Sequence, residues 1–594
     1  MSAPDWVRRF RAARVSLPVW ALHAPQRTTY ATNASGVWQI VSWDRDEGRH
    51  TTLTDKPTGV LGGTPLPDGS GVAWFDDHAG DEVGRYVVTP FYGGGARPLV
   101  PEIDEGWAGG LSLRTGRIAV GSIRRDGTHL YVTDEEGTRE VYRHAQPADI
   151  GGLSRDGRLL AVAHTEHGDA MHPAVRLLDP AGGEVLADLW DGEGMTVTPA
   201  GWSRVPGDAR LAIHADRSGR TRPELYDAAG GERIPLELDL PGEVWVADWW
   251  PGGTALLLAH DHLGRTELHR YDLRAHRADP LELTDGTVRA ARVRDDGSIW
   301  YAFSSSARPP EIRVRDDAGD RPLLRPPGDP APPGAAYESL HYDNGEGGQV
   351  HAFLATPPAE APHPLVVTAH GGPAAACEDS FDPSVQAWVD HGFAVLLPNY
   401  RGSTGYGKRW EDAVLGDPGR PEVVDLLAGR DRLVDDGTAA AGRVVLTGGS
   451  WGGYLTLQAL GTQPHAWDAG IAVVPVADYV SAVADESPAL REFDRTIFGG
   501  MPDEAPDLYR ERSPITYADR VRAPVLIITG ANDTRCPKRQ VDNYVAALRA
   551  HGVPHAYEVY DAGHGTLEVA EAIRQQALAI DFAAEHLGTP VAQR

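Results

Sequence analysis

Hydrophobic and polar residues alternate with period two through the first half of the chain, in short segments that each end in a polar turn. This alternation predicts β-strands with one buried face. Seven of the segments share a comparable turn position, and successive positions are 44 to 48 residues apart. These turn positions are Asp44, Thr89, Asp134, Asp179, Asp227, Asp272 and Asp316.

A second series of strand-like segments, such as GRLLAVAH and TALLLAH, lies between the turns. A repeat of about 45 residues that holds several short strands is typical of a β-propeller blade. The period of two disfavours a helical solenoid. The sequence therefore predicts a seven-bladed β-propeller over residues 20–325.

The pattern changes after the proline-rich stretch RPPGDPAPPG, which predicts an interdomain linker over residues 326–336. Beyond it, continuous apolar segments such as FAVLLPNY and PVLIITG alternate with helix-like segments. Continuous apolar strands are typical of a parallel sheet covered by helices on both faces. Residues 337–594 are therefore expected to form an α/β domain.

The first 19 residues are interpreted as an amphipathic helix that packs on this second domain through Trp6, Phe10 and Ala13, which recur at helical spacing. The paired Arg8 and Arg9 occur in export signals too, but the apolar stretch after them is short and is broken by Pro18. We therefore favour the packed helix.

The strongest candidate for chemistry is the motif Gly448-Gly449-Ser450-Trp451-Gly452, which directly follows the strand-like segment RVVLT and precedes the helix-like segment GYLTLQALG. A nucleophile elbow needs glycines at this tight turn from strand to helix, which lifts the serine hydroxyl out of the sheet. Ser450 is therefore the predicted nucleophile of an α/β-hydrolase domain.

A serine hydroxyl needs a base, and the base needs an acid that orients it. In α/β-hydrolases these follow the serine in the order Asp, His, at the ends of later strands. Asp533 follows the strand PVLIITG, and His564 follows the strand AYEVYDAG. We expect both in the catalytic triad. The competing residues Asp561, His551 and His555 are interpreted as surface residues.

Acyl transfer also needs two donors for the oxyanion. The first is the amide of Trp451, directly after the nucleophile. The second is expected from the segment His370-Gly371-Gly372-Pro373 after the strand PLVVTA, through the amide of Gly372 or of Gly371. The choice between these two glycines stays open.

Five ordered motifs, HGGP at 370–373, NYRGSTGYG at 399–407, GGSWGGY at 448–454, NDTRCP at 532–537 and DAGHG at 561–565, resemble the acylaminoacyl-peptidase branch of the prolyl oligopeptidase family of serine peptidases. The resemblance covers the whole C-terminal domain, and the propeller fits the family architecture. It implies that Arg535 binds the carbonyl or acyl group before the cleaved residue. It also points to Val476, Leu490 and Phe493 as the specificity pocket, although these residues suit an ordinary core equally well.

The dipeptidyl peptidases of this family hold the substrate amine with paired glutamates in a helical insertion of the propeller, and this sequence has no such segment. Glu135 and Glu136 fall in a blade turn and are expected to be solvated. Acids that could reach the site from the propeller are Glu102, Asp104 and Glu105.

Composition narrows the classes of function further. At 594 residues the chain exceeds what one hydrophobic core supports. A formal net charge of −28, without a basic stripe, argues against nucleic acid as a partner. No apolar run is long enough to span a bilayer. Two cysteines, Cys377 and Cys536, exclude a disulfide framework and suit the cytoplasm.

No metal or cofactor is expected. The segment HTEHGDAMH holds His164, His167 and His172, but it falls at a blade connection and is interpreted as solvated. The predicted function is a serine peptidase that cleaves short peptides or aminoacyl amides near the N-terminus through an acyl-enzyme on Ser450. The alternatives are an esterase or amidase for small compounds and a catalytically inactive propeller binding protein. The cleaved residue, a free or blocked N-terminus, and homo-oligomer formation stay open.

Overall fold

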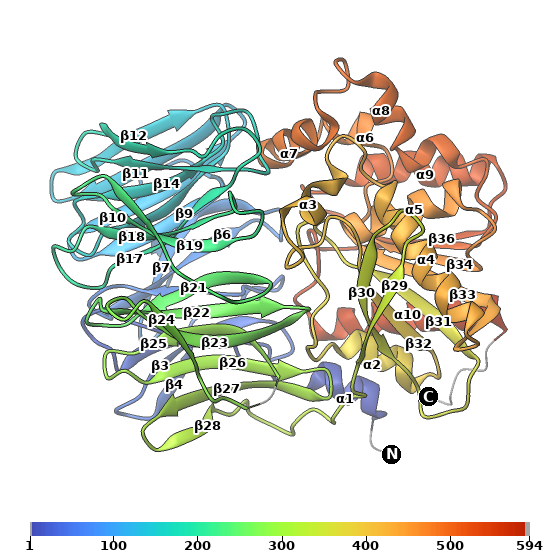
Figure 1. Cartoon of the computed structure of the whole chain (residues 1–594), viewed down its shortest axis with the longest axis horizontal. Helices are drawn as coiled ribbons and strands as arrows, with labels where there is room; N and C mark the ends of the chain where they lie inside the picture. The colour runs from blue at the N-terminus through green and yellow to red at the C-terminus, as the bar shows by residue number, and fades with distance from the viewer. Residues whose placement is uncertain (1–2, 285, 589–594) are drawn as a thin grey trace.

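The structure is a computed structural model that describes residues 3–284 and 286–588. Strands β1–β28 form a β-propeller, drawn on the left of Figure 1, and β29–β36 form the sheet of the second domain on the right. Five four-stranded sheets of the propeller are separate blades. Their strands are β1 (Val19–Trp20), β2 (Arg27–Thr32), β3 (Gln39–Asp44), β4 (Arg49–Thr52); β13 (Ala148–Leu153), β14 (Leu160–His164), β15 (Ala174–Leu178), β16 (Val185–Leu189); β17 (Val197–Trp202), β18 (Arg210–Ala215), β19 (Arg222–Asp227), β20 (Glu232–Pro235); β21 (Glu243–Trp249), β22 (Ala255–His262), β23 (Arg265–Asp272), β24 (Arg277–Pro280); and β25 (Thr287–Val293), β26 (Ile299–Ser305), β27 (Arg308–Asp316), β28 (Gly319–Leu324).

The prediction of seven separate blades is wrong, because the second and third repeats share one eight-stranded sheet. This sheet contains β5 (Thr64–Pro65), β6 (Gly71–Asp77), β7 (Val83–Pro90), β8 (Arg97–Pro98), β9 (Gly106–Arg114), β10 (Arg117–Arg124), β11 (Gly127–Asp134) and β12 (Gly137–His144). Strand β7 pairs with β9 through Val83–Trp107 and Gly84–Gly106. A Cβ at Gly84 would lie 1.9 Å from the carbonyl oxygen of Asp76 on β6, so glycine permits the close pairing of β6 with β7 next to this junction.

The recurring aspartates of the repeats close the turns that follow the third strands. The Asp134 carboxylate accepts a hydrogen bond from the amide two residues ahead, at 3.1 Å, and Asp227 and Asp316 do the same at 2.9 Å. An aspartate that mimics the backbone in this way stabilises a tight turn. The signal that marked the repeat in the sequence therefore has a physical cause.

The sheet of the second domain runs in the order β29-β30-β32-β31-β33-β34-β35-β36, with parallel pairing from β32 to β36. The strands are β29 (Glu338–Asp343), β30 (Gln349–Ala355), β31 (His363–Ala369), β32 (Ala394–Asn399), β33 (Ala439–Gly449), β34 (Ala469–Val473), β35 (Val525–Gly530) and β36 (His555–Tyr560). The helices are α2 (Pro383–Asp390), α3 (Lys408–Glu411), α4 (Pro421–Asp435), α5 (Trp451–Thr462), α6 (Tyr479–Ala482), α7 (Pro488–Phe498), α8 (Pro506–Glu511), α9 (Lys538–Ala550) and α10 (Val569–Leu587), with 3-10 turns at Asp412–Val414 and Pro514–Tyr517. Two apolar clusters, one on each face of this sheet, form the core. This is the expected α/β-hydrolase architecture.

The N-terminal helix α1 (Asp5–Arg11) lies against α2 and α10, at the bottom of Figure 1. Phe10 is buried in the core of the second domain, and the Trp6 ring lies 5.7 Å from the ring of His391. The helix ends before Ala13, which the pattern had placed on its packing face. Arg9 donates hydrogen bonds to the Pro333 carbonyl and to Asp390, so the helix also ties the linker to α2.

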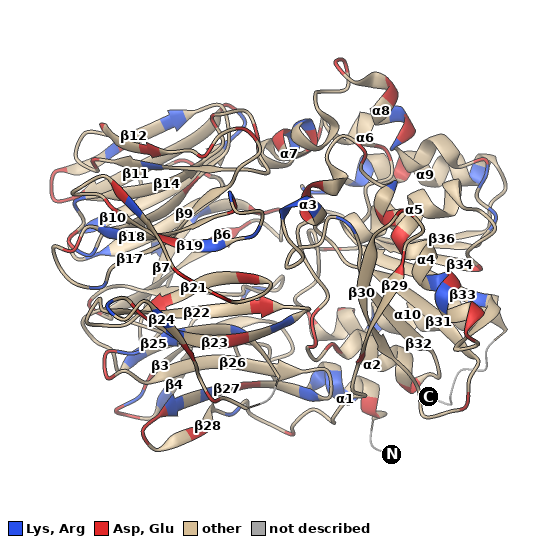
Figure 2. Ribbon diagram, in the orientation of Figure 1, with Lys and Arg blue, Asp and Glu red and all other residues tan. Residues whose placement is uncertain are grey.

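Asp379 is a central anchor between the propeller and the second domain. Its carboxylate accepts hydrogen bonds from the Ser306 amide and the Arg265 guanidinium, both at 3.0 Å. Its own amide donates to the Gly264 carbonyl at 2.9 Å. In the ribbon of Figure 2, segments coloured for Lys and Arg and segments coloured for Asp and Glu are interspersed in both domains. No helix within residues 3–284 and 286–588 is both long and apolar enough to cross a membrane.

His172 makes a second contact between the two parts. Its Nδ1 lies 2.6 Å from Asp169 Oδ2, and across the interface its Nε2 lies 3.0 Å from Asp412 Oδ1, so the protonated ring donates to both carboxylates. Burial lowers the pKa of His172, but the two carboxylates outweigh burial and raise the pKa to about 9. The imidazolium therefore stabilises the folded interface fully below pH 6.5, and this contribution is lost as the pH rises through about 9.

We predict that His172→Gln lowers the Tm by about 2 to 4 °C at pH 6 and has little effect at pH 10. The Gln side chain removes the charge that links Asp169 with Asp412. Thermal unfolding of both proteins over this pH range measures the difference, and the exposed His551→Gln serves as the control. Equal Tm values for wild type and His172→Gln at pH 6 would contradict the role of His172.

Candidate active site

Ser450 lies in the sharp turn between β33 and α5, with φ of 56° and ψ of −119°. A non-glycine residue in this region is strained by about 1 to 3 kcal/mol, a cost that clusters at functional sites. The neighbouring glycines make the turn possible: a Cβ at Gly448 would lie 2.6 Å from the Ala369 carbonyl oxygen, and one at Gly452 would lie 2.1 Å from it. The geometry is that of a nucleophile elbow.

Asp533 and His564 lie in the loops after β35 and β36 and contact each other. His564 Nδ1 lies 2.8 Å from Asp533 Oδ2. The Asp533 side chain is fully buried, and its Oδ1 accepts hydrogen bonds from the amides of Arg535 and Cys536 at 2.9 and 2.8 Å. The carboxylate is thereby held in one orientation, with its second oxygen facing the imidazole.

Cys536 connects this pair to the serine. Burial raises the pKa of the Cys536 thiol well above its ordinary value, and a hydrogen bond with Ser450 acts against that rise. The thiol also lies within 4.8 Å of a carboxylate oxygen of Asp533 and a ring nitrogen of His564. The buried thiol therefore lies against the Asp533–His564 pair, in the loop that follows β35.

The competing residues lie apart from this cluster. Asp561 and His551 are exposed. His555 faces the Val553 carbonyl, with Nδ1 2.8 Å from that oxygen.

The glycine loop after β31 lies beside the nucleophile. A Cβ at Gly371 would lie 3.6 Å from Ser450 Cβ, and Gly372 has a φ of +132°, which glycine tolerates. Trp451 is the first residue of α5, so its amide has no acceptor within the helix. Either glycine amide, with that of Trp451, remains our candidate for the oxyanion site.

His370 fixes the shape of this loop. Its ring stacks on Tyr400 at 4.1 Å between centroids, and the Tyr400 hydroxyl donates to the His370 carbonyl at 2.6 Å. Burial lowers the pKa of His370 to about 4, so the ring is neutral at pH 7. A neutral, packed ring supports the glycine loop without adding charge to the site.

Arg535 forms a bidentate ion pair with Glu82 of the propeller, with distances of 2.6 Å from Nη2 and 2.9 Å from Nε. Glu82 has a φ of 62° and ends the loop that precedes β7. Of the acids proposed from the sequence, Glu105 pairs with Arg85 at 3.1 Å, and Glu102 and Asp104 are exposed. Glu82, which the sequence reasoning missed, is the acid that pairs with Arg535.

The same propeller loop covers the loops of the triad. Thr534 Oγ1 donates to the Asp81 carbonyl at 3.0 Å, and Asn532 Nδ2 donates to the Ala79 carbonyl at 3.3 Å. A Cβ at Gly563 would lie 1.8 Å from the Gly80 carbonyl oxygen. No pattern within residues 78–82 indicated this contact, because the partner loop is more than 450 residues away in the chain.

The residues proposed for the specificity pocket partly share one apolar cluster. Val476 is buried in the cluster of Trp451, and Phe493 packs against it with its ring 6.3 Å from the Trp451 ring. Leu490 is half-buried in the first turn of α7. The contacts place Val476 and Phe493 beside the residue that follows the nucleophile.

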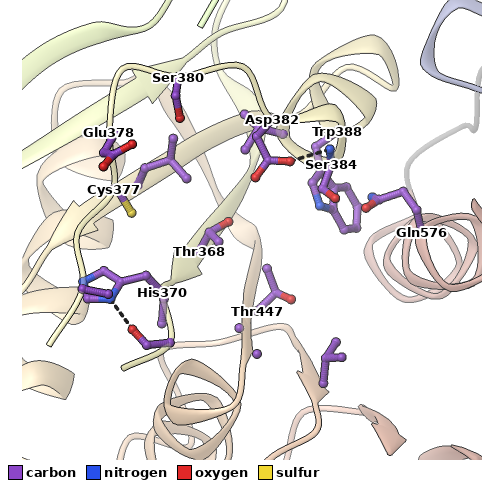
Figure 3. Close-up of a pocket in the computed structure, with 18 of the residues that line it drawn as sticks. Thr368, His370, Cys377, Glu378, Ser380, Asp382, Ser384, Trp388, Thr447 and Gln576 are labelled. Carbon is purple, nitrogen blue, oxygen red and sulfur yellow. Dashed lines mark hydrogen bonds between the residues drawn. The ribbon is translucent and has the colours of Figure 1, made fainter. Parts of the chain in front are cut away.

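A cavity of about 780 Å³ reaches the back of the site. Figure 3 shows Thr368, His370, Cys377 and Glu378 on its walls, and its lining includes Gly371, Gly448 and Gly449. A second cavity, of about 870 Å³, runs among the inner strands of the propeller. Both are lined by Asp261, Arg289 and Glu378, so they meet at the domain interface.

Two of the three histidines of the blade connection, His164 and His172, are not solvated as predicted, whereas His167 is exposed. His164 is buried and lies 3.1 Å from Asp188, and His172 is buried at the interface. His167 stacks on Trp190 at 4.1 Å. The three ligand-type side chains His164, His167 and Asp188 lie close together, but Asp188 is also engaged by Arg176.

The chain is similar to known peptidases in sequence and to solved structures in fold. The model of the prolyl oligopeptidase family matches residues 379–590. Dipeptidyl aminopeptidase BIII of Pseudoxanthomonas mexicana is 28% identical over 535 residues, which cover 82% of this chain and 74% of that protein. Dipeptidyl peptidase family member 6 of Caenorhabditis elegans is 35% identical over 285 residues, but these cover 47% of this chain and 37% of that protein. The crystal structure of puromycin hydrolase superposes with a TM-score of 0.84 at 22% identity, covering 100% of this chain and 97% of the other.

We predict that Asp533→Asn folds normally but loses about four orders of magnitude in turnover, because the amide stabilises the wrong tautomer of His564. Hydrolysis of a small ester, with the Tm as a check of folding, measures the effect. Asp561→Asn is the matched control and is expected to keep full activity. Near-normal turnover of Asp533→Asn would exclude Asp533 from the triad.

Proposed function

This chain is a serine peptidase of the prolyl oligopeptidase family, and from that premise we propose that it cleaves short peptides or aminoacyl amides near their N-termini through an acyl-enzyme on Ser450. The observation that carries the proposal is the buried Asp533–His564 pair beside a strained serine at the turn from β33 to α5. No other described part of the chain combines an elbow, a base and an orienting acid.

The residues have the following proposed roles. His564 removes the proton from Ser450 as Oγ attacks the carbonyl carbon, and Asp533 holds the imidazole and stabilises its charged form. The amides of Trp451 and of Gly371 or Gly372 stabilise the oxyanion. His564 then protonates the leaving amine, and water hydrolyses the acyl-enzyme by the same steps.

We propose four segments for the chain: a helix at 1–19, the propeller at 20–325, a linker at 326–336 and the catalytic domain at 337–594. The absence of regular structure between β28 and β29 supports the linker. Both cysteines are free thiols, which supports a reducing compartment such as the cytoplasm.

The pair Arg535–Glu82 bears on the N-terminus of the substrate. A guanidinium binds the neutral carbonyl of a blocked or longer peptide, as in an acylaminoacyl peptidase. A carboxylate binds a free ammonium, as in an aminopeptidase or a dipeptidyl peptidase. Because both charges lie at the site, the aminopeptidase is the second candidate, and Glu82 is the observation that favours it.

The proposed function is tested with a fluorophosphonate probe and a set of peptides. We expect the wild type to be labelled and to cleave short chromogenic peptides, and Ser450→Ala to do neither. We also expect folded proteins to be spared, because a folded chain cannot enter the cavities between the domains. Labelling without cleavage of any amide would indicate an esterase, and no labelling would indicate a binding protein.

We predict that substitutions of the two partners of the ion pair lower kcat/KM for different substrates. Arg535→Ala is expected to lower kcat/KM for acetylated aminoacyl amides by roughly tenfold to a hundredfold, the 1.5 to 3 kcal/mol of a hydrogen bond to a charged group. Glu82→Gln is expected to spare these substrates and to lower kcat/KM for amides with a free amine. p-Nitrophenyl acetate, which has no preceding carbonyl, is the control substrate. Equal losses of ester and amide turnover in Arg535→Ala would show that Arg535 supports the loop of Asp533 instead.

A further inference from the structure

Two acidic side chains, Glu486 and Asp494, are buried together in the catalytic domain. Glu486 lies just before α7 and Asp494 lies on it, and each is only 4% exposed. The two carboxyl groups lie close enough to influence each other's pKa. Among the described residues, neither Glu486 Oε2 nor Asp494 Oδ2 receives a hydrogen bond from an N–H or O–H donor of the protein. Buried carboxyls are normally satisfied by donors, so this pair lacks its partner.

The acid pair lies next to the nucleophile. The charges of both acids act on the Cys536 thiol, and Ser450 hydrogen-bonds the same thiol. The Ser487 amide donates to the Thr534 carbonyl at 3.2 Å, which joins the start of α7 to the loop of Asp533. Phe493, the neighbour of Asp494 on α7, lies with its ring 6.3 Å from that of Trp451, so α7 packs beside the residue that follows the nucleophile.

Two further polar groups of this region are unpartnered. The Tyr479 hydroxyl and Trp451 Nε1 are buried and have no hydrogen-bond partner among the described residues. Tyr479 is 1% exposed, and the charges of both acids act on its phenol. The Tyr479 hydroxyl is thus an unpartnered polar group near the two acids, whereas Trp451 Nε1 faces Glu422, and a polar ligand group would complete the unpartnered atoms.

Glu422 and Asp425 are two further buried acids of this domain. Asp425 pairs with Arg401 at 2.8 Å. Glu422 Oε2 accepts a hydrogen bond from the Gly419 amide at 2.8 Å, but Glu422 Oε1 has no partner among the described residues. Arg491 acts on Glu486 through its charge, and it is half-buried. The acid pair differs from Glu422 in that two acids are buried side by side, and a cation is the group that would complete them.

We propose that Glu486 and Asp494 form the base of the specificity pocket and select substrates with a cationic side chain, lysine or arginine, at the residue whose carbonyl Ser450 attacks. This inference deepens the proposed function and rests on it. An ammonium or guanidinium group donates to the unpartnered oxygens, and the trunk of the side chain packs against Phe493 and Val476.

Charge balance is kept when the cation enters. Burial raises the pKa of Asp494 to about 8, and burial with the charge of Asp494 raises that of Glu486 well above its ordinary range. The empty pair therefore holds protons at pH 7. Binding of the cation displaces one proton to solvent and leaves an ion pair in its place, so no bare charge is buried.

The approach to the site carries acids too. Asp261 and Glu378 lie where the two cavities meet, together with one arginine, Arg289. With a formal net charge of −28 over the whole chain, this surface attracts positively charged peptides.

The test uses two covalent inhibitors of serine hydrolases, the diphenyl phosphonates of N-acetyl-lysine and N-acetyl-norleucine, which match in length and differ in charge. We expect the wild type to be inactivated at least about tenfold faster by the lysine compound, as one charged hydrogen bond implies. Glu486→Gln and Asp494→Asn should each reduce this preference to within about threefold, with little change for norleucine. Asp485→Asn, which removes an exposed acid paired with Arg539 at 2.5 Å, is the matched control and should keep the preference.

Equal inactivation of the wild type by both compounds, or faster inactivation by norleucine, would overturn the proposal, and neither result depends on a variant that folds. An unchanged preference in both pocket variants would overturn it as well. The phosphonates react with Ser450 without amide turnover. A preference for lysine without cleavage of any peptide would therefore refute the proposed peptidase function and leave the charge selection of the pocket standing.

Discussion

The contact between the propeller loop 78–82 and the two loops that carry Asp533 and His564 is the constraint on which the site depends. The backbones of the propeller loop and the His564 loop are in direct contact, because a side chain at Gly563 would collide with the Gly80 carbonyl oxygen. The contact holds the acid and the base from the propeller side, and it delivers Glu82 to Arg535. The same propeller loop therefore contacts the loops of Asp533 and His564 and pairs with Arg535. The propeller is thus a structural part of the site.

Buried carboxyl groups without hydrogen-bond donors are the second feature of this structure. Most buried carboxylates have donors: Asp533 receives two amides and a histidine, and Asp379 binds across the domain interface. Within the described part of the chain, Glu486 Oε2 and Asp494 Oδ2 receive no hydrogen bond. Since a buried acid without a partner destabilises the fold, the pair makes physical sense as a place that a cationic group of the substrate completes.

At the elbow and in the shared propeller sheet, glycines permit close contacts between backbone segments. Gly448 and Gly452 let β33 and α5 approach β31 so that Ser450 takes a positive φ. Gly84 lets β7 pair closely with β6 next to the junction with β9. In both places the missing side chain allows two backbone segments to approach each other closely.

The sequence by itself determined the elements whose causes are local. The alternation of residues predicted the strands, the turn aspartates marked each repeat because they hydrogen-bond two residues ahead, and GxSxG predicted the elbow because only glycines fit beside Ala369. The pairing of Asp533 with His564 also followed from strand order. Tertiary structure alone decided the rest: the merging of two repeats through β7 and β9, the partner of Arg535, and the meeting of Glu486 with Asp494 beside Cys536. These contacts join residues by packing across elements, and no local pattern encodes which distant side chains a fold brings together.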